Sequence, residues 1–127
     1  MKQMKRILVI DDEAIIRESL KLSLETEDGL EVLTACSGID GLSIARAERP
    51  DAILLDVMMP GMDGLATFQE LQADAATRSI PVMFVTGNVE LVARHGLAEC
   101  GAAGVIAKPF SPADLRIRVA GLLAGKA

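Results

Sequence analysis

Five polar side chains that can bind a cation or an anion stand at the ends of short apolar runs: Asp11, Asp12, Asp56, Thr86 and Lys108. Runs such as Ile7–Ile10 and Ile53–Leu55 are continuously apolar and rich in branched residues, which is typical of buried parallel strands. Ligands of an open α/β sheet bind just beyond the carboxyl ends of its strands. We therefore expect three carboxylates, a hydroxyl and an ammonium in one cleft, a set that suits a divalent cation and a phosphoryl group.

The acidic residues of this cleft point to a magnesium site. Asp11 and Asp12 are adjacent, so the strand must break into its loop there, because neighbouring residues on a regular strand face opposite sides. Together with Asp56 they form a set of three carboxylates, which repel one another unless a cation lies between them. Mg²⁺ fits this set best, since it prefers hard oxygen ligands and partners phosphate. The single histidine, His95, and the two cysteines offer no zinc cluster.

The other two cleft residues suit a phosphoryl group. Lys108 supplies a positive charge that can pair with Asp56 at rest and with a phosphoryl oxygen afterwards. Thr86 supplies a hydroxyl donor for another such oxygen. Carboxylate, metal and cation are the parts that phosphoryl transfer uses, because its catalysis is mainly positioning and charge neutralisation. For each residue alone the structural alternative is a solvated lysine, or a threonine that caps the following helix.

Strand and helix patterns alternate along the chain. The expected strands are 7–10, 31–35, 51–56, 81–86 and 104–107, and the expected helices are 14–27, 38–49, one from Asp63 past Leu71, 89–99, and one from Ser111 past Leu122. No pattern holds over 75–79. Because crossovers between parallel strands are right-handed, these units predict a five-stranded doubly wound parallel sheet. The expected class is α/β, flavodoxin-like, with helices on both faces, as a single domain over residues 1–127.

Composition excludes several other classes of protein. The chain has 18 acidic and 13 basic residues, a net charge of −5, and its lysines and arginines are scattered, so we expect no direct nucleic-acid binding. No apolar stretch approaches the roughly 20 residues of a membrane span. Basic residues precede the first apolar run, as in a signal peptide, but the run is too short and meets two aspartates at once, so we reject that interpretation. The expected location is cytoplasmic, with Cys36 and Cys100 as reduced, structural thiols.

Four segments carry a resemblance to the receiver domain of bacterial two-component response regulators: ILVIDDE, DAILLDVMMPGMDG, PVMFVTG and GVIAKPFSP. The resemblance implies that Asp56 is the phosphoacceptor, which takes a phosphoryl group from a phosphohistidine on a sensor kinase. It also implies that Asp11 and Asp12 hold Mg²⁺ together with Asp56 and the backbone carbonyl of Met58. By the same likeness, Thr86 and Lys108 contact the phosphoryl group.

The likeness extends to smaller features and has one departure. It implies a cis peptide at Lys108–Pro109, and it implies that Met58 and Asn88, each two residues beyond a site residue, tune hydrolysis by gating the attacking water. Receivers often carry an aromatic residue or histidine three positions before the lysine, where this chain has Val105. The chain has no Tyr and no Trp, so the aromatic half of the usual switch is missing.

The resemblance also implies partners and a mode of action. The expected partners are a sensor histidine kinase or phosphotransfer protein and a downstream protein or output domain, with a homodimer as a further option. The expected readout surface is 89–99, strand 104–107 and the last helix, with Leu91 and Ile117 as exposed apolar positions. Such a chain is not an enzyme in the usual sense: it is a signalling receiver that assists its own phosphoryl transfer and dephosphorylation.

Three alternatives differ in class. An aspartyl-phosphate phosphatase needs a second Asp two residues after the nucleophile, where this chain has Met58. A flavodoxin-like cofactor binder needs a phosphate-cradling loop after the first strand, where the sequence DDEA would repel an anion. A pseudo-receiver would keep the fold as a protein-interaction module and lose the phosphorylation.

Overall fold

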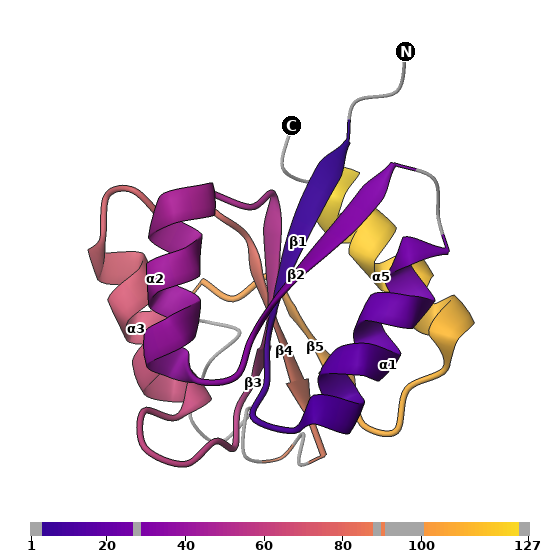
Figure 1. The fold of residues 1–127 in the computed structure, drawn as a ribbon, viewed down its shortest axis with the longest axis horizontal. Coiled ribbons are helices and arrows are strands. Elements are labelled where there is room, and N and C mark those ends of the chain that lie inside the picture. Colours follow the sequence, from indigo (N-terminus) through magenta and orange to yellow (C-terminus); the bar gives the residue numbers. More distant parts are fainter. Residues whose placement is uncertain (1–3, 27–28, 88–89, 91–100, 125–127) are drawn as a thin grey trace.

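The computed structural model describes residues 4–26, 29–87, 90 and 101–124, and it forms one parallel sheet with strand order β2-β1-β3-β4-β5 (Figure 1). The strands are β1 (Lys5–Ile10), β2 (Leu30–Ala35), β3 (Ala52–Asp56), β4 (Val82–Thr86) and β5 (Gly104–Ala107). The helices are α1 (Ala14–Glu25), α2 (Gly38–Glu48), α3 (Gly64–Ala73) and α5 (Pro112–Ala124). The helix expected at 89–99 lies outside the described residues, apart from Glu90.

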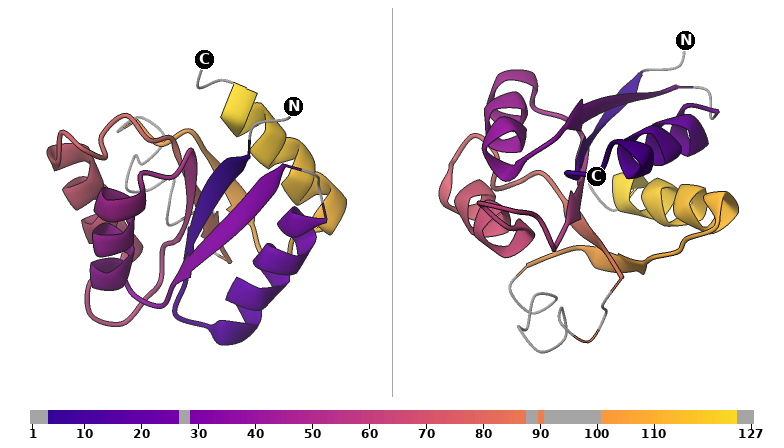
Figure 2. Two further views of the ribbon diagram at one scale, coloured as in Figure 1. Left: turned by 45° about the horizontal axis from the view of Figure 1, so that its top comes forward. Right: turned by 60° about the horizontal axis from the view of Figure 1, so that its bottom comes forward.

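Helices cover both faces of the sheet. Helices α1 and α5 lie on one face, and α2 and α3 lie on the other (Figure 2). Strand residues alternate between the two faces, because successive side chains of a strand point to opposite sides. Leu8, Ile10 and Phe84 pack in the core under α2 and α3, whereas Ile7 and Val9 pack in the core under α1 and α5. The predicted doubly wound parallel sheet is confirmed.

The register of the sheet aligns the strand ends. Ile10 lies opposite Leu55, so the next residues along β1 and β3 are Asp11 and Asp56. Asp56 in turn lies opposite Val85 of β4, and the last residues of β4 and β5 pair with each other. Side chains that follow these strands therefore emerge at one edge of the sheet.

Side-chain caps and one left-handed residue set the bounds of these elements, and some bounds differ slightly from the expected ones. Ser37 and Asp63 cap α2 and α3 by accepting a main-chain hydrogen bond in the first turn. Helix α2 ends before Pro50, because Arg49 already adopts the left-handed conformation, with φ of 47°. Strand β3 begins at Ala52 and not at Asp51, whose carboxylate accepts a 2.9 Å hydrogen bond from the Arg6 N–H.

The unpatterned segment between α3 and β4 is held by polar contacts. The Asp74 carboxylate accepts a 2.9 Å hydrogen bond from the Ala76 N–H. Thr77 is 1% exposed, and its hydroxyl donates to the Leu71 carbonyl at 2.7 Å. Among the described helices, none is long and apolar enough to cross a membrane.

Candidate functional site

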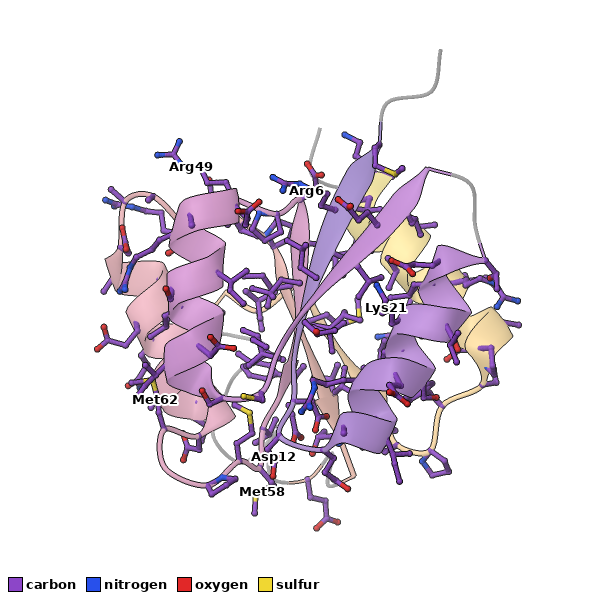
Figure 3. All side chains as sticks on the ribbon, viewed as in Figure 1. Arg6, Asp12, Lys21, Arg49, Met58 and Met62 are labelled. Atoms are coloured by element: carbon purple, nitrogen blue, oxygen red, sulfur yellow. The ribbon has the colours of Figure 1, made fainter. Side chains whose placement is uncertain are left out.

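Three carboxylates meet at the carboxyl edge of the sheet. Asp11, Asp12 and Asp56 each offer an oxygen within 4.8 Å of the others. Asp11 and Asp56 are 1% and 4% exposed, whereas Asp12 faces solvent. Figure 3 shows Asp12 and Met58 at the same end of the sheet. The structure therefore brings together the acidic residues that the strand ends predicted.

Lys108 bridges two of these carboxylates. Its Nζ lies 3.3 Å from Asp11 Oδ2 and 3.4 Å from Asp56 Oδ1. Burial disfavours the ammonium, but the negative charges of Asp11 and Asp56 outweigh burial and raise the pKa of Lys108. The sequence suggested a pair with Asp56 alone, so the contact with Asp11 is an addition from the structure.

The electrostatics of Asp56 favour a bound cation. Burial, followed by the nearby charge of Asp11, raises the pKa of Asp56 from 3.8 to about 6, although Lys108 and the Met58 N–H act in the opposite direction. A hard divalent cation placed among these oxygens would relieve the repulsion between Asp11 and Asp56. All the side-chain donors are carboxylate oxygens, which fits Mg²⁺ and not a soft metal.

Thr86 and Lys108 lie where the paired strands β4 and β5 end. Thr86 is 0% exposed at the end of β4. The Lys108 N–H donates to the Thr86 carbonyl at 2.8 Å, which continues the pairing of β4 and β5 past the last strand residue. The Lys108–Pro109 peptide is cis. The contacts of the Lys108 ammonium with Asp11 and Asp56 place it among the carboxylates.

Gly64 lets α3 approach the loop that follows Asp56. A Cβ atom at Gly64 would lie 2.1 Å from the Asp56 carbonyl oxygen, so any larger residue would displace the helix or the loop. The Gly64 N–H donates to the Val57 carbonyl at 3.0 Å. The sequence analysis assigned no role to Gly64, because a glycine at a helix start has no distinctive spacing.

Other residues with described positions include Val105, Met58, Phe110 and Cys36. Val105 is half-buried, lies opposite Phe84 in the sheet, and packs against the core under α2 and α3. The Met58 side chain is 65% exposed, and Phe110 packs partly buried against the core under α1 and α5. Cys36 is a free thiol, as expected, and it is exposed.

Several residues named from the sequence have no described position. Asn88, Leu91, His95 and Cys100 lie outside the described residues. Ile117, by contrast, is described and is 70% exposed on α5, as expected. The hydrolysis-tuning role of Asn88 therefore stays a prediction.

Comparisons with known proteins agree on one family. A model of the response regulator receiver domain matches residues 7–120. The probable transcriptional regulator ycf27 of Porphyra purpurea is 41% identical over 121 residues, which make up 95% of this chain and 48% of that protein. The response regulator MprA of Mycobacterium avium (strain 104) is 36% identical over 118 residues, which make up 93% of this chain and 50% of that protein. The chain thus spans about half the length of these curated relatives.

A solved structure supports the same fold. The chemotaxis protein CheY4 of Vibrio cholerae superposes with a TM-score of 0.86 at 28% identity, covering 94% of this chain and 98% of that one.

Proposed function

The chain belongs to the response regulator receiver domain family, and from that premise we propose that Asp56 accepts a phosphoryl group from a phosphohistidine. The observation that carries this proposal is the buried Asp56 carboxylate, which lies close to the carboxylates of Asp11 and Asp12 and to the ammonium of Lys108. The donor is a sensor histidine kinase or a phosphotransfer protein. A receiver is a signalling protein, and this domain functions as a phosphorylation switch.

The transfer itself is a nucleophilic displacement at phosphorus. An Asp56 carboxylate oxygen attacks, the P–N bond to the donor imidazole breaks, and the P–O bond of an acyl phosphate forms. The residues that would hold Mg²⁺ are Asp11, Asp12 and Asp56, with the backbone carbonyl of Met58. When bound, Mg²⁺ supplies neutralisation of the charge on the phosphoryl oxygens.

Lys108 and Thr86 connect the transfer to a conformational change. At rest Lys108 pairs with Asp11 and Asp56, and after transfer a phosphoryl oxygen attracts its ammonium in place of the Asp56 carboxylate. The Thr86 hydroxyl donates to another phosphoryl oxygen. The new charge biases an equilibrium between two states. Because Val105 is not aromatic, the readout here depends on packing around β5 and not on the reorientation of a ring.

Further parts of the proposal concern the fate of the phosphoryl group and the setting of the domain. The chain assists its own dephosphorylation, and Met58 and Asn88 tune the access of the attacking water. The partner surface is 89–99, β5 and α5, used by a downstream protein, an output domain or a second copy. We place this domain, 1–127, in the cytoplasm.

Intact mass spectrometry tests the acceptor directly. The protein is incubated with acetyl phosphate, with and without Mg²⁺, beside Asp56→Asn. Asp63→Asn is the matched control, because asparagine retains the capping function at the start of α3. We expect one phosphoryl adduct that requires Mg²⁺ and Asp56 and persists in the control.

Two outcomes contradict the proposal. An adduct of equal yield in Asp56→Asn would move the acceptor to another residue. No adduct in folded wild-type protein would favour an interaction module that lacks phosphorylation.

Lys108→Ala separates transfer from switching. We expect the phosphoryl adduct to form in this variant, while the affinity for a partner stays the same with and without the adduct.

A further inference from the structure

Arg17 of α1 holds the main chain of the acidic pair. Its Nη1 donates to the Asp11 carbonyl oxygen at 2.8 Å. Arg17 is half-buried, and its own N–H donates to the Glu13 carbonyl at 3.0 Å in the first turn of α1. The guanidinium therefore ties the start of the helix back to the residue at which β1 ends.

The other polar atoms of Asp11 are also engaged. Its N–H donates to the Ala35 carbonyl of β2 at 3.1 Å, and its Oδ1 accepts from the Glu13 N–H at 2.9 Å. Its Oδ2 faces Lys108. The carbonyl is thus the one remaining polar atom of Asp11, and the Arg17 side chain, six residues further along the chain, is its partner.

The contact with Arg17 bears most strongly on Asp12. A peptide unit is planar, so fixing the Asp11 carbonyl fixes the plane that ends at the Asp12 Cα. The Asp12 carboxylate is exposed, so its direction toward Asp56 depends on the backbone that carries it. A charge-assisted hydrogen bond from a rigid guanidinium is stronger than a neutral one and suits this task.

We propose that Arg17 is a positioning residue for the magnesium site. It orients the Asp11–Asp12 peptide so that both carboxylates face Asp56. The inference rests on the proposed function, because it assigns the cation affinity of that same site to a residue that touches neither cation nor phosphoryl group.

Calorimetric titration with Mg²⁺ tests this role without any phosphorylation. The variants are Arg17→Gln, Arg17→Lys and the matched control Lys21→Gln, which removes the same charge from the same helix. Lys21 contacts Glu25 and the Val32 carbonyl and not the acidic pair. Loss of a partner that orients a metal ligand typically weakens metal binding by roughly 10-fold or more. We expect about a tenfold rise in the Kd for Mg²⁺ in Arg17→Gln, a smaller rise in Arg17→Lys, and less than about a twofold rise in Lys21→Gln.

Thermal unfolding in EDTA separates positioning from general stability. A merely structural role for Arg17 would lower the Tm of the metal-free protein and leave the Kd for Mg²⁺ near that of wild type, which would overturn the inference. Loss of a positive charge alone would lower the Kd for Mg²⁺ or leave it unchanged. Equal rises in Kd for Arg17→Gln and Lys21→Gln would therefore show a general disturbance of α1, and they would also overturn the inference. If Arg17→Gln does not fold, the comparison of Arg17→Lys with Lys21→Gln decides. A wild-type protein that binds no Mg²⁺ would refute the magnesium site itself, and the inference with it.

Discussion

Replacing Asp56 by asparagine should stabilise the metal-free protein at neutral pH, although it removes the proposed acceptor. Asn is nearly isosteric with the neutral form of Asp, so the substitution removes the charge and keeps the shape. The folded structure disfavours that charge, because burial and the nearby Asp11 raise the pKa of Asp56 from 3.8 to about 6. In this structure Lys108 also lies 3.3 Å from Asp11, a contact that we expect the variant to keep.

The magnitude follows from proton linkage. The folded protein keeps the Asp56 proton up to its pKa of about 6, whereas the unfolded chain releases it near pH 3.8. Between these values the native state binds more protons than the unfolded state, so the free energy of unfolding falls as pH rises. The fall is complete above about pH 7 and amounts to about 3 kcal/mol, since each pKa unit corresponds to about 1.4 kcal/mol. Asp56→Asn has no carboxyl group that titrates at this position, so it does not lose this free energy of unfolding.

Urea unfolding followed by far-ultraviolet circular dichroism measures the effect. Wild-type protein and Asp56→Asn are compared in EDTA across the range from acid to neutral pH. At pH 7.5 we expect the variant to be more stable by about 3 kcal/mol, or roughly 10 °C in Tm. Near pH 4 the two proteins should be nearly equal. Saturating Mg²⁺ should reduce the difference in stability at pH 7.5. The cation compensates the Asp56 charge and so stabilises the wild-type protein more than the variant, which has no charge at this position.

Two results would refute this reasoning. A difference in stability that is the same at pH 4 and pH 7.5 would show that it comes from packing and not from the Asp56 charge. A less stable variant at pH 7.5 in EDTA would show that the contact with Lys108 outweighs the cost of burial.

Other substitutions test the structure around the site. Lys108→Ala leaves Asp11 and Asp56 without their shared cation, so we expect a loss of about 3 kcal/mol in EDTA at pH 7.5, largely restored by Mg²⁺; urea titrations with and without the metal measure both, and a loss that Mg²⁺ leaves unchanged would contradict it. Gly64→Ala puts a Cβ 2.1 Å from the Asp56 carbonyl oxygen and should cost about 2 kcal/mol in the same assay. Gly121→Ala, in α5 with nothing within 4 Å of the new Cβ, should instead stabilise by up to about 1 kcal/mol. Equal effects of the two glycine substitutions would show that the close approach at Gly64 is not the cause.

Much of the fold was predictable because its signals are local. Buried parallel strands must be continuously apolar, so each run and its first polar residue stand out in the sequence. Asp56 and Thr86 could be assigned to strand ends in this way, and the structure has them as the last residues of β3 and β4. Boundaries that depend on one dihedral angle were less accurate: the helix expected over 38–49 ends at Glu48, because Arg49 is left-handed.

Some contacts at the site were not predictable from the sequence, although the pairing of Lys108 with Asp56 was expected. Lys108 binds Asp11 as well as Asp56, across 97 and 52 residues. The close approach at Gly64 and the hydrogen bond from Arg17 to the Asp11 carbonyl also left no pattern in the sequence. The exposure of the free Cys36 thiol was not predicted either, because burial depends on neighbours that the local sequence does not reveal.

The sequence by itself determined the order of strands and helices and the chemical types at the strand ends, since apolar periodicity and strand-end polarity are properties of short segments. Only the tertiary structure decided the pKa of Asp56, the sharing of Lys108 between two carboxylates and the anchoring of the acidic pair by Arg17. These three features depend on burial and on distances of a few ångströms between residues of different strands, loops and helices. Such burial and distances arise only when the sheet and its helices have packed together.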